Sequence, residues 1–120
     1  MQKHRKLQAW QQCRDLSVEI YRVTARFPSR ERFGLTSQLR RAAVSAAANI
    51  AEGYARFGSG ELAHALSLAL GSLAELDTLL EIADAVGTLS ADDRQRLDEL
   101  RLHASQSTYL MQRSVRQPSR

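Results

Sequence analysis

The stretch LTSQLRRAAVSAAANIAEGYAR, residues 35–56, constrains the fold of this chain more than any other part of it. A threonine and two adjacent arginines stand near its start, and a run of alanines and other small residues follows. Small side chains favour helix strongly and allow a second helix to approach closely. Asn49, Glu52 and Gly53 interrupt the run, although an ordinary amphipathic surface helix would not need them. The stretch therefore predicts a central helix with a specialised surface.

Hydrophobic periodicity predicts three further helices around this one. The four helices are expected at about residues 6–26, 36–57, 60–86 and 91–115. Pro28 ends the first helix, because the residue before a proline is pushed out of the helical region. Thr36, Ser59 and Ser90 are the expected N-caps of the later helices, and Gly87 is the expected glycine after the third.

The third predicted helix has the clearest pattern. Its main apolar residues repeat at spacings of four and three, which is the seam typical of a coiled coil. They are Leu62, Leu66, Ala69, Leu73, Leu76, Leu80 and Ala83. A second stripe predicts contacts with neighbours on two sides of this helix. Its members are Leu70, Leu79, Ile82 and Val86.

These patterns predict an all-α fold. Four amphipathic helices joined by short loops, with no strand pattern, fold most simply as an up-down-up-down antiparallel four-helix bundle. No linker or internal repeat divides the 120 residues, so we expect a single domain over residues 1–120. Hydrophobic residues make up 43% of the chain but aromatic residues only 6%, so leucine and alanine must fill the core.

The sequence also limits where the protein works. No apolar run has the length needed to cross a bilayer, so no transmembrane helix is expected. The basic start MQKHRKLQAWQQ has no hydrophobic region behind it and does not resemble a secretory signal. Cys13 is the single cysteine, so no disulfide forms within the chain. We therefore expect a cytoplasmic protein.

Residues able to catalyse a reaction or bind a metal are sparse. His4, His64 and His103 are scattered, with no recognisable nucleophilic arrangement beside them. The one metal-like string is ELAH at residues 61–64, whereas di-iron bundles need two Glu-x-x-His strings and two further glutamates. We therefore expect a non-enzymatic protein without a metal or other cofactor.

Polar side chains lie among the small residues of the central stretch. Asn49 and Glu52 are three residues apart, and Arg41 precedes Asn49 by eight, so the three share a broad side of the helix. Glu75 belongs to the third predicted helix, where a buried carboxylate would need a partner such as an arginine of the second helix. We predict that Asn49, Glu52 and Glu75 form a structural polar network that sets helix register. The alternative is a ligand site, but no second feature marks a pocket.

Basic residues are concentrated in the first half of the chain. Residues 1–60 carry eleven Lys and Arg against four acidic residues, a net charge of +7, whereas residues 61–120 carry six Arg against nine acidic residues, a net charge of −3. Such a chain can present a basic face to an anion and an acidic face to a neighbouring subunit. Grouped arginines and lysines contact phosphates without reading bases. The candidate nucleic-acid-binding residues are Arg40, Arg41, Arg56, Arg30, Arg32, Lys3, Arg5 and Lys6.

Other readings of these charges stay open. No recognised nucleic-acid-binding module is visible in the sequence, and a solvated charged surface is the alternative to RNA binding. Trp10, Phe27 and Phe33 are expected first in the core or in an interface.

The segment QLRRAAVSAAANIAEG, residues 38–53, resembles the pattern QLRRAAvSipaNIAEG of a family of four-helix bundle proteins. This family includes proteins encoded in intervening sequences of bacterial 23S ribosomal RNA genes. FP at residues 27–28, FGLT at 33–36 and LALGSLAEL at 68–76 extend the likeness. Ala46 and Ala47 replace the Ile-Pro that is frequent in the family, so a proline kink should be absent here.

The resemblance implies a ring-like homo-oligomer and favours a pentamer. The surplus apolar area of the second and third predicted helices agrees with an assembly, because monomers rarely expose large apolar patches. More distantly, the chain is similar to accessory proteins of the reverse transcriptases of diversity-generating retroelements. Arg40, Arg41 and Arg56 match basic positions of the family pattern, which favours a structured RNA as the anion. The alternative is an interaction scaffold that docks a partner protein without binding nucleic acid.

Overall fold

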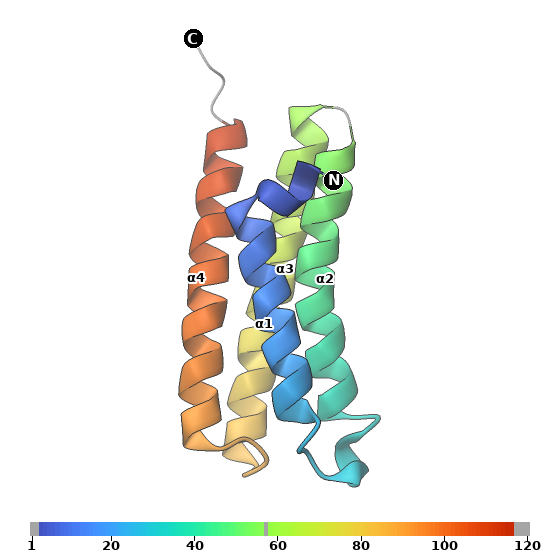
Figure 1. The fold of residues 1–120 in the computed structure, drawn as a ribbon, viewed down its shortest axis with the longest axis vertical. Coiled ribbons are helices and arrows are strands. Elements are labelled where there is room, and N and C mark those ends of the chain that lie inside the picture. The colour runs from blue at the N-terminus through green and yellow to red at the C-terminus, as the bar shows by residue number, and fades with distance from the viewer. Residues whose placement is uncertain (1–2, 57, 117–120) are drawn as a thin grey trace.

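A computed structural model describes residues 3–56 and 58–116, which form four α-helices and two short 3₁₀ helices (Figure 1). In chain order they are η1 (Lys3–Lys6), α1 (Gln8–Thr24), η2 (Ser29–Glu31), α2 (Leu35–Ala55), α3 (Ser59–Ala85) and α4 (Ala91–Arg116). The long helices run alternately up and down, and α1 and α3 each pack against both α2 and α4. The predicted all-α, up-down-up-down antiparallel bundle is confirmed.

Leucine and alanine fill the interior of the bundle. The predicted seam of α3 is buried except at its first member, Leu62, which is partly buried against the core. No more than 1% of the surface is exposed at Leu66, Ala69, Leu73, Leu76, Leu80 and Ala83. In the second stripe Leu79 is buried, but Ile82 and Val86 stay 44% and 62% exposed. The prediction that α3 has neighbours on two sides is confirmed, because α3 packs against both α2 and α4. In the described part of the molecule, no helix combines the length and the apolar content needed to cross a membrane.

The helix starts show which residues cap them. Ser90 is confirmed as a cap of α4, because its Oγ accepts the Asp93 backbone N–H at 3.1 Å. The prediction of Thr36 as the cap of α2 is wrong, since Thr36 is buried within the first turn. Glu31 supplies the cap from outside the helix, where its Oε1 accepts the Leu35 backbone N–H at 3.2 Å. At α3 the N-cap position is Gly58, at φ +108°, and Ser59, the predicted cap, is the first residue of the helix, with a side chain outside the described part of the structure.

Gly53 allows α2 and α3 to pack closely at the end of the bundle where they are joined. It is buried, and a Cβ placed on it would collide with the Cβ of Ala65 on α3. By contrast, Gly71 in the middle of α3 is exposed, and a Cβ there would meet no atom within 4 Å. The glycine that interrupts the small-residue run is therefore a packing residue.

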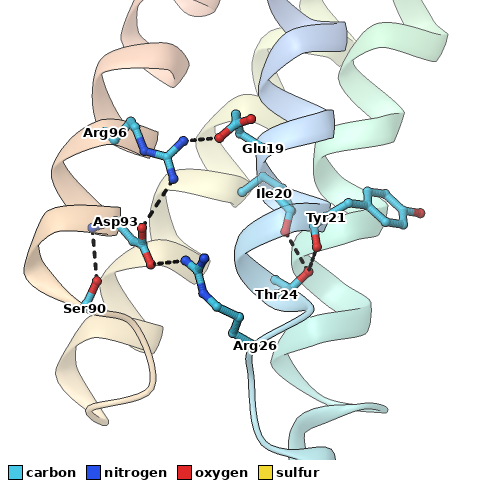
Figure 2. A network of polar contacts seen from close by, with 8 residues as sticks. All are labelled: Glu19, Ile20, Tyr21, Thr24, Arg26, Ser90, Asp93 and Arg96. Carbon is cyan, nitrogen blue, oxygen red and sulfur yellow. Dashed lines mark hydrogen bonds and ion pairs between the residues drawn. The ribbon is translucent and has the colours of Figure 1, made fainter.

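An ion-pair network joins the C-terminal end of α1 to the first turns of α4 (Figure 2). Arg96 on α4 binds Glu19 on α1, and it also reaches Asp93 Oδ1 at 3.3 Å. Arg26, just beyond α1, donates from Nη2 to Asp93 Oδ2 at 2.7 Å. The network therefore ties the first and last long helices together on the outside of the bundle.

These contacts lower the pKa of two carboxyl groups. The hydrogen bond from Arg96 holds the pKa of Glu19 below its usual value. Burial raises the pKa of Asp93, but the hydrogen bonds from Arg26, Arg96 and Ser90 outweigh that effect, so its pKa also lies below its usual value. A carboxyl group with a lowered pKa in the folded state stabilises the fold above its unfolded pKa, and that stabilisation is lost as the pH falls.

The Gly53→Ala substitution should destabilise the bundle. The added methyl group forces α2 and α3 apart, and overpacking of this kind costs about 1–3 kcal/mol. The matched substitution Gly71→Ala should be neutral or stabilise the fold by up to about 1 kcal/mol, because it improves helix propensity in open space. Urea unfolding followed by circular dichroism measures both changes. Equal midpoints for the two variants would contradict the close packing at Gly53.

The Arg96→Gln substitution should lower the free energy of unfolding at neutral pH by about 1 kcal/mol or less, as expected for a surface network. Because Glu19 and Asp93 must be ionised, the difference from the wild type should be full above about pH 5 and shrink towards about pH 3. Arg113→Gln, which removes an exposed arginine in the last turn of α4, is the control. A difference that is independent of pH would argue against the network.

Candidate nucleic-acid interface

The bundle separates the eight predicted nucleic-acid-binding residues into two groups. Arg30, Arg32, Arg40 and Arg41 lie at the end where α1 leads through η2 into α2. Lys3, Arg5 and Lys6 belong to η1 at the start of α1, and Arg56 follows α2. Arg56 follows α2 sixteen residues after Arg40, a separation that corresponds to roughly 24 Å along a helix. The eight residues therefore do not form one continuous surface on a single chain.

An open depression lies at the α1–η2–α2 end. Its volume is about 580 Å³, and it is lined by Tyr21, Arg32, Phe33, Thr36, Ser37, Arg40, Arg41, Val44 and Ser45. We call it the basic depression. Three of the predicted arginines meet here because the loop that carries Arg32 folds back beside the first turns of α2. Two aromatic side chains, Tyr21 and Phe33, share the same walls.

Arg40 is held against α1. Its Nε donates to Thr24 Oγ1 at 2.9 Å, and its guanidinium carbon lies 4.4 Å from the centre of the Tyr21 ring. Thr24 in turn donates to the Ile20 carbonyl at 2.6 Å (Figure 2). Cation–π contact and hydrogen bonding together fix the guanidinium. Arg40 therefore joins α2 to α1 while it contributes positive charge to the depression.

Arg30, Arg32 and Arg41 are the exposed cations of this end. In the described ranges 3–56 and 58–116, none of the three forms an ion pair with a carboxylate. Arg26 is close to them in sequence, but its charge is balanced by Asp93. The basic character of the depression thus rests on a subset of the arginines around the loop.

Arg56 differs from this subset. Its guanidinium lies 2.9 Å from Glu52 Oε1 and 3.8 Å from Glu61 Oε2. The family pattern marks Arg56 as basic, but two carboxylates already offset its charge. We therefore expect a weaker contribution to anion binding from Arg56 than from Arg32 or Arg41.

The predicted polar network of Asn49, Glu52 and Glu75 is not what the structure shows. Asn49 donates to the Ser45 carbonyl at 2.9 Å, and Ser72 of α3 donates to Ser45 Oγ at 3.0 Å. Glu52 instead contacts Arg56, and Glu75 is exposed, so its carboxylate needs no buried partner. The polar link between α2 and α3 therefore uses serines, which sequence reasoning missed because their hydroxyls are common on any helix surface.

The sequence predicts Phe33 in the core or in an interface, and the fold of one chain excludes the core. Its side chain is 87% exposed, whereas Trp10 and Phe27 are partly buried against the core. Phe33 stands in the loop before α2, outside the apolar stripe of any helix. That position between Arg32 and Gly34 was the available signal for a surface role.

A second, apolar groove continues from the basic depression along α1 and α2. Its volume is about 450 Å³, and its walls are Trp10, Ser17, Val18, Tyr21, Val44, Ala47 and Ala48, with Arg14 and Arg22 beside them. Tyr21 and Val44 line both hollows. The molecule therefore presents a charged and an apolar surface side by side between the same two helices.

The residues considered for catalysis or metal binding are not gathered into a centre. Glu61 and His64 line a hollow of about 440 Å³ together with Arg56. The described part of the chain holds no group of three or more His, Cys, Asp or Glu placed to bind a metal ion. Cys13 lies in the core, where burial raises the pKa of its thiol to about 11.

Comparison with known proteins identifies the relatives of this chain. This chain is similar to the crystal structure of a protein of unknown function from the S23 ribosomal protein family of Bacteroides thetaiotaomicron. The match covers 86% of this chain and 96% of the chain in that structure. The two share the fold, with a TM-score of 0.77 at 16% sequence identity. The search of curated proteins found no match. The model of the family described as 23S rRNA-intervening sequence protein matches residues 5–108, so the chain belongs to that family.

Proposed function

We propose that this protein is a non-catalytic, homo-oligomeric, cytoplasmic RNA-binding protein whose basic depression contacts phosphates of a structured RNA. Little sequence preference is expected, because arginine contacts to phosphate position a nucleic acid but do not read its bases. The name of the family connects its members with an intervening sequence of 23S ribosomal RNA, which supports RNA as the polyanion.

The observation that carries the proposal is the pair of exposed arginines in the basic depression that have no carboxylate partner in the described part of the chain. Arg32 and Arg41 line it together with the fixed guanidinium of Arg40. Like charges gathered in this way repel one another, and a bound anion removes that repulsion. Arginine also matches the geometry of phosphate oxygens, to which it can donate two parallel hydrogen bonds.

The apolar groove favours assembly with other copies of the chain. Tyr21 and Val44 remain 46% and 44% exposed there, at positions where apolar surface meets water. The basic first half and acidic second half of the chain complement each other between copies. The family resemblance favours a pentamer, in which copies of the basic depression would contact one RNA together.

The same groove supports the second candidate function, an interaction scaffold that docks a partner protein without nucleic acid. In that case the arginines are solvated surface charge. The two candidates differ in whether Arg32 and Arg41 affect RNA retention.

The Arg32→Gln, Arg41→Gln double variant should bind a structured RNA hairpin at least about tenfold more weakly than the wild type at roughly 0.1 M salt. The slope of log affinity against log salt concentration should also become shallower, by an amount that corresponds to the loss of between about one and two phosphate contacts. Fluorescence anisotropy at several salt concentrations measures both quantities.

Arg56→Gln is the matched control for the single variants Arg32→Gln and Arg41→Gln, because each removes one positive charge, but the charge of Arg56 is already offset by Glu52 and Glu61. We expect a smaller loss of affinity for this variant than for either single variant of the depression. Equal losses in all variants would show that net charge, and not the basic depression, determines binding. A wild type that does not bind RNA would favour the scaffold.

The Ala48→Glu substitution should reduce the assembly to smaller species. Ala48 is exposed on the wall of the apolar groove, so the chain can fold with glutamate there, but a charge in the groove opposes contact with a second copy. Light scattering coupled to size exclusion measures the mass, which for a pentamer is five times 13.4 kDa. Ala74→Glu, at an exposed alanine of α3, should leave the mass unchanged. A monomeric wild type would contradict the assembly.

A further inference from the structure

Phe33 exposes more of its side chain than any other large apolar residue of the described chain. Its exposed fraction is 87%, and the next highest value is 62%, at Val86. A single exposed apolar residue is common on protein surfaces and needs no explanation by itself. What distinguishes Phe33 is its setting, an ordered loop among arginines.

The backbone around Phe33 is held by a chain of hydrogen bonds. Within η2 and the residues after it, the Glu31 N–H donates to the Pro28 carbonyl at 2.9 Å and the Gly34 N–H donates to the Glu31 carbonyl at 3.0 Å. The Glu31 carboxylate then caps α2. A Cβ on Gly34 would lie 2.9 Å from Glu31 Oε1, so glycine preserves this cap. The loop therefore presents Phe33 to solvent from a defined backbone.

The side chains around Phe33 are charged. The guanidinium carbon of Arg32 lies 5.3 Å from the centre of the Phe33 ring, and Arg41 lines the same depression. Covering Phe33 with an uncharged apolar partner would also strip water from these cations, which is unfavourable without an anion to pair them. A ligand that fits must combine a flat apolar surface with negative charge close by. An unpaired nucleotide has both.

We infer that an unpaired RNA base stacks on Phe33 while neighbouring phosphates bind Arg32 and Arg41. This inference rests on the proposed RNA-binding function and names the part of the RNA that is bound. Bases inside a duplex are already stacked and do not offer a face, whereas loops and bulges present bases that can stack on aromatic side chains. Stacking accepts every base because each has a flat π face, which agrees with low sequence preference.

The test compares two RNA hairpins with the same stem and the same number of phosphates. One has an ordinary loop, and in the other the loop nucleotides are abasic, so only the bases differ. The wild type should bind the ordinary hairpin at least about fivefold more tightly, the lower end of what one stacked base contributes. Both hairpins should show the same dependence on salt, because their phosphates are identical.

Variants assign this preference to Phe33. Phe33→Leu should bind the two hairpins with nearly equal affinity, because leucine keeps an apolar side chain but has no flat ring. Phe33→Tyr should restore the preference. Leu110→Ala, which removes apolar surface at a 53% exposed position of α4, should leave the preference at the wild-type value.

The outcomes separate this inference from the proposed function. Salt-dependent binding of both hairpins with equal affinity would overturn the stacking inference and leave RNA binding intact. A Phe33→Leu variant that retains the preference would overturn it as well. A Phe33→Leu variant whose assembly mass changes would assign Phe33 to a subunit contact and also overturn it. Failure of the wild type to bind either hairpin would overturn both the inference and the proposed function.

Discussion

Close packing of α2 against α3 is the constraint on which the rest of this structure depends. Gly53 meets Ala65 at a distance that leaves no room for one added methyl group. Alanines such as Ala43 and Ala46 are fully buried along the same helix. The small side chains of α2 serve this packing. The surface of α2 that faces away from α3 therefore remains available for other contacts. The basic depression and the apolar groove both use that surface, between α2 and α1.

Some arginines form ion pairs that link helices, and others remain available to contact an anion. Arg26 and Arg96 tie α1 to α4 through Asp93 and Glu19. On the other side of the bundle Arg94 contacts Glu81, Asp84 and Asp98, and thereby links α3 to α4. Pairs of this kind contribute little stability singly, but they remove charge from the surface seen by an anion. Arg30, Arg32, Arg40 and Arg41 have no carboxylate ion pair among the described residues, and they are gathered where α1 leads into α2, which gives the first half of the chain a localised basic site.

The fold could be predicted because it depends on periodicity, which a sequence displays directly. The α3 seam was predicted from this periodicity, and the cap at Ser90 was predicted from its residue type at the start of a periodic segment. The cap of α2 was not, because Glu31 reaches it from a loop whose conformation depends on tertiary structure. The candidate site was only half predictable for a similar reason. The sequence shows Glu52 four residues before Arg56, a spacing that allows an ion pair on a helix, but only the folded chain shows Glu61 beside Arg56.

Ultraviolet crosslinking of a bound RNA, followed by mass spectrometry of the peptides, tests the central claim most directly. The claim is that RNA contacts the end of the bundle where α1 passes through η2 into α2. Crosslinks should then concentrate in residues 30–45 and be lost when salt disrupts binding. Crosslinks confined to η1, the region around Arg56 or α4 would contradict the account, because they would place the RNA away from the basic depression.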